Sequence, residues 1–169
     1  TERKRIERAL ADVRSRLDAA LQAGAIATWT WDVPHNRLFA DDELAPIRTA
    51  IVGYGLSGRI FHAPFLEADE RFSIEAVSTS DPGRRARAAA DHPAARIYDS
   101  HEELLAQSFD LVVLASPAHV HLEQGRAALA SGAALVIDKP FAASVAEAEQ
   151  LIGAASAAGR PLIVFQNRR

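Results

Sequence analysis

The stretch IVGYGLSGRIFHAPFL, residues 51 to 66, decides the fold of this chain. An apolar run ends at Gly53, Gly55 and Gly58, which have G-x-G-x-x-G spacing, and a run with helical character follows. This pattern predicts a strand, a tight turn and a helix whose N-terminus can hold a pyrophosphate. The first glycine permits the turn, the second lets phosphates approach the backbone, and the third lets helix and strand pack closely. We therefore favour a dinucleotide-binding turn over an ordinary structural one.

The residues after Arg48 alternate between strand and helix patterns. Apolar runs predict strands at residues 49–55, 72–78, 96–99, 109–116, 133–138 and 161–167. Helical patterns cover residues 57–68, 81–92, 100–107, 118–132 and 144–159, with Asp81, Ser100 and Ser144 as expected N-caps. Pro64 is expected to kink or shorten the first helix. The alternation predicts an α/β, Rossmann-type fold, a doubly wound parallel sheet with helices on both faces.

Residues 1–45 have a different character. Apolar side chains at Ile6, Leu10, Val13, Leu17 and Leu21 form one stripe of a helix, which either packs on a neighbour or forms a short dimeric coiled coil. Residues 25–42 then predict a short β-hairpin. The expected domains are therefore 1–45, a helix with a hairpin, and 46–169, the dinucleotide-binding domain.

The composition excludes several classes of protein. The 169 residues carry a net charge of −3, which gives no general electrostatic case for nucleic acid or a membrane surface. The chain has no cysteine, so disulfides and thiolate metal sites are impossible, and this fits a cytoplasmic protein. Its histidines do not cluster with carboxylates, so no metal site is expected.

The end of the second strand bears on the choice of cofactor. An acidic residue about 20 positions after the glycines holds the ribose 2′-hydroxyl in NAD binders. Ser78, Thr79 and Ser80 stand there instead, and Arg84, with Arg85 beside it, could pair with a 2′-phosphate. This favours NADP. The alternative is NAD, with Asp81 turned toward the ribose, but the N-cap role of that residue argues against it.

Two longer stretches carry family resemblances. SPAHVHLEQGRAALASGAALVIDKPFA, taken with the glycine turn and VFQNRR, resembles the Gfo/Idh/MocA oxidoreductases over residues 48–169, and most of all their NADP-dependent scyllo-inositol dehydrogenase branch. Residues 10–45, which include ALQAGAIATWTWDVPHNRLF, resemble the start of a PAS sensor domain. That second resemblance covers only a small part of such a domain, so a truncated or fused segment is expected.

The Gfo/Idh/MocA resemblance implies site residues. Ser116 and Pro117 would line the nicotinamide pocket, and His121 would match a family histidine. Lys139, between Asp138 and Pro140, would lie beside nicotinamide and substrate and assist proton transfer as the catalytic residue. His62, His101 and His119 are expected at the surface. The full expected cofactor-binding set is Gly53, Gly55, Leu56, Ser57, Gly58, Ser78, Thr79, Ser80, Arg84, Ser116, Pro117, His121, Lys139 and Pro140.

The same resemblance implies a second domain, with the substrate pocket and an oligomer interface, which this sequence does not contain. The chain is therefore expected to be the cofactor-binding half of an NAD(P)-dependent oxidoreductase acting on a sugar or polyol hydroxyl. Alone it would be inactive or weakly active, because the substrate would be neither positioned nor shielded from water. The alternative is a non-catalytic nucleotide-binding or signalling module, a homodimer formed through the N-terminal helix.

Overall fold

The computed structural model describes residues 29–32, 37–40 and 45–166. The chain divides into two compact units, Thr1–Ala45 and Pro46–Arg169. In the first unit β1 (Trp29–Asp32) pairs antiparallel with β2 (Arg37–Ala40), with Trp29 opposite Ala40. These strands match the predicted hairpin. The predicted helix over Ile6 to Leu21 lies outside the described residues, and the PAS-like interpretation stays a prediction.

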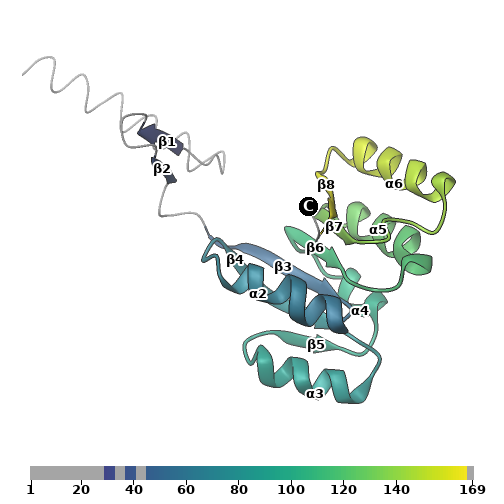
Figure 1. The fold of residues 1–169 in the computed structure, drawn as a ribbon, viewed down its shortest axis with the longest axis horizontal. Coiled ribbons are helices and arrows are strands. Elements are labelled where there is room, and N and C mark those ends of the chain that lie inside the picture. Colours follow the sequence, from purple (N-terminus) through teal and green to yellow (C-terminus); the bar gives the residue numbers. More distant parts are fainter. Residues whose placement is uncertain (1–28, 33–36, 41–44, 167–169) are drawn as a thin grey trace, which may run out of the picture. The chain divides into compact units, whose positions relative to one another are not determined.

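The second unit is built on six parallel strands, in the order β5-β4-β3-β6-β7-β8 (Figure 1). The strands are β3 (Ile47–Val52), β4 (Phe72–Ser78), β5 (Arg96–Tyr98), β6 (Leu111–Leu114), β7 (Ala134–Asp138) and β8 (Leu162–Phe165). The chain adds strands in one direction from β3 and in the other from β6. The order therefore reverses between these two central strands, where open α/β sheets bind ligands. The prediction of a Rossmann-type α/β fold is confirmed.

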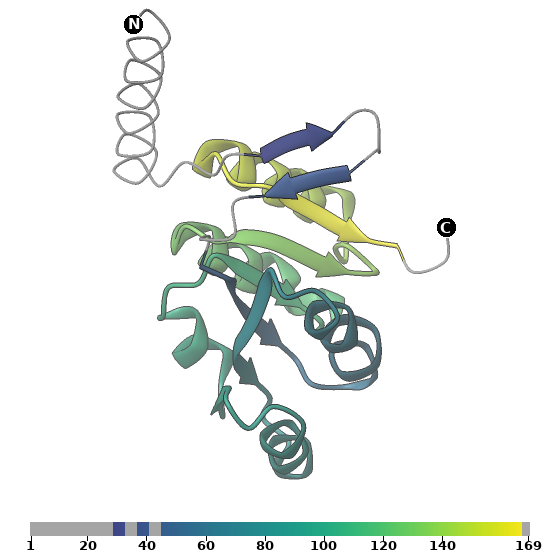
Figure 2. The same ribbon diagram turned by 90° about the vertical axis from the view of Figure 1, so that its left-hand side faces the viewer.

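Helices cover both faces of this sheet (Figure 2). They are α2 (Ala63–Glu67), α3 (Pro82–Asp91), α4 (His101–Leu105), α5 (His121–Ala130) and α6 (Val145–Ala158). Alternate residues of the central strand serve the two sides: Ala50 and Val52 join the cluster under α4, α5 and α6, and Ile51 joins the cluster with α2 and α3. Because β6 is buried on both faces, its four residues are all apolar, LVVL.

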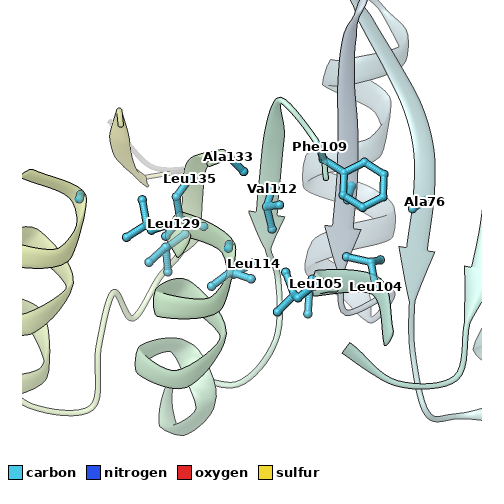
Figure 3. Close-up of a cluster of buried hydrophobic side chains, with 14 of the residues drawn as sticks. Ala76, Leu104, Leu105, Phe109, Val112, Leu114, Leu129, Ala133 and Leu135 are labelled. Carbon is cyan, nitrogen blue, oxygen red and sulfur yellow. The ribbon is translucent and has the colours of Figure 1, made fainter. Parts of the chain in front are cut away.

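The larger of the two clusters runs under three helices (Figure 3). Leu104 of α4 and Leu135 of β7 are both fully buried in it. Side chains of this size contribute about 1.5–3 kcal/mol each to folding when they are fully removed from water. This packing fixes the strands against the helices, so the carboxyl ends of the strands are held in place.

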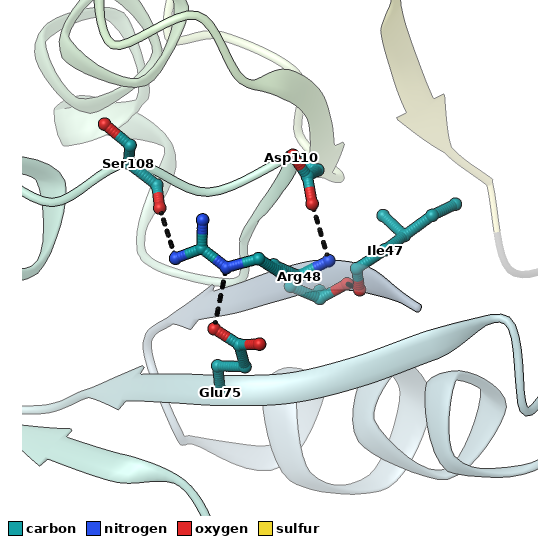
Figure 4. Close-up of polar contacts among 6 residues, drawn as sticks. Ile47, Arg48, Glu75, Ser108 and Asp110 are labelled. Carbon is teal, nitrogen blue, oxygen red and sulfur yellow. Dashed lines mark hydrogen bonds and ion pairs between the residues drawn. The ribbon is translucent and has the colours of Figure 1, made fainter. Parts of the chain in front are cut away.

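Arg48 ties the amino ends of the central strands together (Figure 4). Its Nε donates to Glu75 Oε2 of β4 at 3.0 Å, and its Nη2 donates to the Ser108 carbonyl at 2.8 Å. The Arg48 backbone N–H donates to Asp110 Oδ2, just before β6. These contacts lie at the sheet edge away from the carboxyl ends of the strands, so they stabilise the sheet without entering the site.

The predicted helix caps are present. The side chains of Asp81, Ser100 and Ser144 each accept a hydrogen bond from a backbone N–H in the first turn of α3, α4 and α6. The segment predicted as one helix over residues 57–68 differs. It forms a π-helix, η1 (Ser57–His62), followed by α2, which has Pro64 in its first turn. Proline has no N–H to give to the preceding turn, so the two helical pieces join at this point.

Candidate functional site

A groove of about 740 Å³ runs along the carboxyl edge of the sheet. The ends of five strands contribute to it: Val52 and Gly53 at the end of β3, Ser78 to Ser80 at the end of β4, Asp99 after β5, Ala115 to Pro117 after β6, and Asp138 of β7. These residues are far apart in the sequence and meet because parallel strands end at the same edge. The groove spans the reversal of strand order between β3 and β6, so its position is that of a cofactor site.

The glycine turn forms one wall of the groove. Gly53 has φ +96°, and a Cβ there would come within 2.9 Å of the Ala115 backbone, so both the turn and the approach to β6 require glycine. A Cβ on Gly58 would lie 2.1 Å from the Gly53 carbonyl oxygen. Gly55 differs from both, because an added Cβ would meet only the Arg84 guanidinium, at 3.7 Å. Space is therefore left over Gly55 on the groove side.

The first turn of η1 carries no side-chain cap. An uncapped helix N-terminus presents N–H groups and partial positive charge to an anion. Ser57 begins this turn, and its side chain lines the groove beside Gly55. The residues present therefore fit a pyrophosphate, which would lie over Gly55 and accept hydrogen bonds from the turn.

The end of β4 provides small hydroxyl side chains and one arginine. Ser78 and Thr79 are buried and Ser80 is exposed, and all three line the groove. Arg84 also lines it. Arg85 turns away: its Nε lies 3.3 Å from Asp99 Oδ1, and its Nη1 donates to the Ser80 carbonyl. Only Arg84 of the two arginines is therefore directed at the groove.

Asp81 is engaged in its cap. Its Oδ1 accepts a hydrogen bond from the Arg84 backbone N–H at 2.7 Å, and the residue is not part of the groove lining. This is the role that the sequence predicted for Asp81, in preference to a turn toward a ribose.

The loop after β6 is held from beneath. Ser116 and Pro117 line the groove, and Ser116 Oγ donates to Gln124 Oε1 at 2.5 Å. His121 is fully buried, with Nε2 at 2.8 Å from the Ser116 carbonyl and Nδ1 at 3.2 Å from the Phe141 carbonyl. His121 is therefore placed behind the groove wall, where it joins the loop after β6 to the loop after β7.

The end of β7 brings Asp138 to the groove, and Lys139 follows it. Lys139 and Pro140 are exposed and lie just beyond the lining residues. Asp138 is 8% exposed, accepts a hydrogen bond from Ser57 Oγ, and has its Oδ1 at 3.9 Å from His62 Nε2. Neither of these two facing atoms has a hydrogen-bond partner among the described residues.

The expectation that His62 lies at the surface is wrong. The residue is 4% exposed and its ring centroid lies 4.5 Å from that of Phe165. Burial lowers the pKa of the His62 imidazole, and the Asp138 carboxylate partly offsets this. The imidazole is buried because β8 brings Phe165 over η1, a contact between segments about a hundred residues apart.

A second polar cluster lies on the other side of the glycine turn. Tyr54 Oη donates to Asp91 Oδ2 at 2.9 Å and lies 2.7 Å from His92 Nε2. His92 Nδ1 lies 2.9 Å from Glu67 Oε1, and Arg59 Nε donates to Asp91 at 2.9 Å. Burial and the Asp91 carboxylate raise the pKa of the Tyr54 hydroxyl above its usual range. The cluster joins η1, α2 and α3 behind the turn.

Nine of the expected site residues line the groove: Gly53, Gly55, Ser57, Ser78, Thr79, Ser80, Arg84, Ser116 and Pro117. Of the others, Leu56 is 73% exposed, Gly58 is buried behind the turn, and His121, Lys139 and Pro140 lie as described above. Sequence reasoning did not assign the remaining polar lining residues to the cofactor: Asp99, Ser100, His101, Glu102, His119, Gln124 and Asp138. Asp99 to Glu102 directly follow β5, and this position after a strand end was the one sequence signal that could have identified them.

Residues 29–32, 37–40 and 45–166 hold no group of three or more histidine, aspartate or glutamate side chains placed to bind a metal ion. None of the helices in these ranges has both the length and the apolar character needed to cross a bilayer.

Comparison with known proteins gives a consistent result. An uncharacterized oxidoreductase of Schizosaccharomyces pombe is 38% identical over 129 residues, covering 75% of this chain and 35% of its own. The scyllo-inositol 2-dehydrogenase (NADP(+)) IolW of Bacillus subtilis is 35% identical over 124 residues, covering 73% of this chain and 34% of its own. The chain therefore spans about a third of the length of these relatives.

A solved structure agrees with the sequence relatives. The WlbA dehydrogenase of Chromobacterium violaceum, in complex with NADH and UDP-GlcNAcA, superimposes with a TM-score of 0.67 at 31% identity. The match covers 75% of this chain and 37% of that enzyme. The model of the oxidoreductase family with an NAD-binding Rossmann fold, GFO_IDH_MocA, matches residues 47–166. With its parallel sheet, its glycine turn and its groove at the strand ends, this chain belongs to the Gfo/Idh/MocA oxidoreductase family, as the NAD(P)-binding domain.

Proposed function

We propose that the groove binds NADP(H), with the pyrophosphate over Gly55 and the 2′-phosphate beside Thr79 and Arg84. The observation that carries the proposal is the space over Gly55, where a Cβ would meet no backbone and only the Arg84 guanidinium at 3.7 Å. Gly53 and Gly58 are required by the protein's own packing, whereas Gly55 leaves room for a ligand. The Arg84 guanidinium, at the edge of this space, gives the 2′-phosphate a charged partner.

The choice of NADP over NAD rests on the end of β4. Ser78 to Ser80 offer hydroxyl groups where NAD binders carry a carboxylate for the ribose, and the nearby Asp81 is occupied by the α3 cap. Arg84 lines the groove, and no side-chain carboxylate is paired with it among the described residues. An NADP-dependent dehydrogenase among the relatives is consistent with this preference.

We further propose that the domain serves an oxidoreductase that acts on a sugar or polyol hydroxyl. The cofactor, once bound, accepts or supplies a hydride. Ser116 and Pro117 would face its nicotinamide end, and Lys139 would exchange the hydroxyl proton of the substrate. Lys139 is exposed in this structure, so these residues alone do not exclude water from the amine. We therefore expect little turnover from the domain by itself. This class of substrate is taken from the scyllo-inositol dehydrogenases among the relatives.

The test is a titration of the purified chain with NADPH and with NADH, followed by nicotinamide fluorescence. We expect saturable binding of both and at least about tenfold tighter binding of NADPH, which corresponds to about 1.4 kcal/mol. Arg84→Ala should remove this difference, whereas Arg87→Ala, on an exposed residue of the same helix, should keep it. Tighter binding of NADH would contradict the ribose assignment, and no binding of either would contradict the proposed function.

A further inference from the structure

Two parts of the groove that are far apart in the sequence share a hydrogen bond. Ser57 Oγ donates to Asp138 Oδ2, across 81 positions of the chain. Ser57 opens η1 directly after the glycine turn, and Asp138 ends β7 directly before Lys139. The segment proposed to hold the phosphates and the segment that carries the lysine are therefore joined by one contact between side chains.

His62 adds a second contact to the same carboxylate. Its Nε2 faces Asp138 Oδ1 at 3.9 Å, and its ring packs against Phe165. Asp138 and His62 are 8% and 4% exposed. A carboxylate in such surroundings is costly unless it is hydrogen-bonded, so Asp138 depends on the Ser57 hydroxyl, while the His62 imidazole packs beside its Oδ1 without a hydrogen bond. This dependence fixes where β7 ends relative to η1.

We propose that Ser57, His62 and Asp138 act together as a positioning group that holds Lys139 in a set relation to the glycine turn. The group stabilises the end of β7 against η1 and need not contact the substrate. Its consequence for cofactor binding rests on the proposed function. Without the Ser57 hydroxyl, the Asp138 carboxylate, which already lines the groove, is no longer held against η1 and can move toward the space proposed for the pyrophosphate, which it would repel, and the strand end before Lys139 is released.

Lysine reactivity gives a test that needs no cofactor. Lys4 and Lys139 are the chain's two lysines. Brief acylation with limiting acetic anhydride, followed by mass spectrometry, therefore reports the labelling of Lys139 relative to Lys4. Ser57→Ala should change this ratio by at least about twofold, because both the exposure and the charge around the amine change. Ser57→Thr keeps the hydroxyl and should restore the wild-type ratio. An unchanged ratio in Ser57→Ala would overturn the proposal.

Cofactor affinity gives the second test. Ser57→Ala should weaken NADPH binding by about tenfold, and Ser57→Thr should retain most of the affinity. Asp138→Asn should weaken the partner bond as well, so the double variant should bind no more than about twice as weakly as the weaker single variant. Affinity losses that simply multiply in the double variant would overturn the proposal. Ser156→Ala, on the exposed face of α6, is the matched control and should leave both measurements unchanged.

Thermal unfolding of each variant separates positioning from general stability. A lower midpoint with unchanged labelling and unchanged affinity would assign the group a structural role only and overturn the proposal. The proposed function is tested separately, by whether the wild-type chain binds NADPH at all. If it does not, the labelling ratio still decides whether Ser57 sets the surroundings of Lys139.

Discussion

Substituting alanine at Gly55 should impair cofactor binding without loss of stability, whereas substituting alanine at Gly58 should destabilise the fold. Gly55 has a φ outside the left-handed region, and its added Cβ meets the protein only at 3.7 Å, an ordinary contact with Arg84. Gly55→Ala should therefore leave the fold intact or stabilise it by about 0.4–1 kcal/mol through the unfolded chain. Gly58→Ala places a Cβ 2.1 Å from the Gly53 carbonyl oxygen, which forces the backbone to move. Such overpacking costs about 1–3 kcal/mol or more.

Gly55→Ala should weaken cofactor binding although its fold stays intact. The methyl group of Gly55→Ala would occupy the space proposed for the pyrophosphate and displace it from the turn. Hydrogen bonds to a charged group are worth about 1.5–3 kcal/mol. Losing one of them should weaken NADPH binding by roughly ten- to a hundredfold, since about 1.4 kcal/mol corresponds to a factor of ten.

The assay combines urea unfolding with NADPH fluorescence titration on the same preparations. The expected result is a Gly55→Ala protein as stable as the wild type that binds poorly, and a Gly58→Ala protein that is clearly less stable. Wild-type affinity in Gly55→Ala would refute the assignment of the phosphate position. Unfolding of Gly55→Ala would show that the space over this glycine is already filled by the protein.

Three further predictions concern side chains around the groove. Arg84→Ala should weaken NADPH binding by about tenfold or more and leave the affinity for NADH nearly unchanged. Arg85→Ala breaks a solvent-accessible ion pair with Asp99 and should change neither affinity by more than about twofold in the same titration. Tyr54→Phe removes the hydroxyl shared with the α3 cluster and should lower the free energy of unfolding in urea by about 1–3 kcal/mol; an unchanged value would show that the cluster does not stabilise the turn. Burial lowers the pKa of His62 in the folded protein, so the unfolded chain takes up the proton first and stability should fall as the pH drops below about 6.5 toward the folded pKa. His62→Gln should reduce the difference in unfolding free energy between about pH 7.5 and about pH 5.5. An equal difference in the variant and the wild type would exclude His62 as a cause of the pH dependence of stability.

Local sequence patterns were enough to predict most of the strands, helices and helix caps. The run FSIEAVS corresponds to β4 residue for residue, because aromatic and β-branched side chains such as Phe72, Ile74 and Val77 favour a strand locally. Asp81 and Ser100 could be recognised as caps because the N–H groups that they bind lie three positions away. The π-helical form of η1 could not be predicted, since it depends on how the helix accommodates both Pro64 and the glycine turn.

The site was predictable only where one segment carries the information. Gly53, Gly55, Thr79 and Arg84 belong to local motifs and line the groove, and their contact with a cofactor stays a prediction. His62 was misjudged because its burial depends on Phe165, and nothing in the surrounding IFHAPF indicates that contact. Asp138 was assigned only as part of a motif, and its bond to Ser57 depends on the sheet order, which places β7 beside β6 and one strand away from β3. Contacts between distant segments follow from the topology of the sheet and cannot be predicted from the spacing of residues within one segment.

The position of Arg48 has a consequence for how this domain could be altered. Its contacts secure the amino ends of β3, β4 and β6, while the groove lies at their carboxyl ends. The residues that hold the sheet together and those proposed to select the cofactor are therefore largely separate sets. Arg84 is exposed and can be exchanged in a library of variants with little risk to folding, whereas buried Thr79 tolerates only side chains of similar size. The domain is for this reason a suitable starting point for changing cofactor preference by directed evolution.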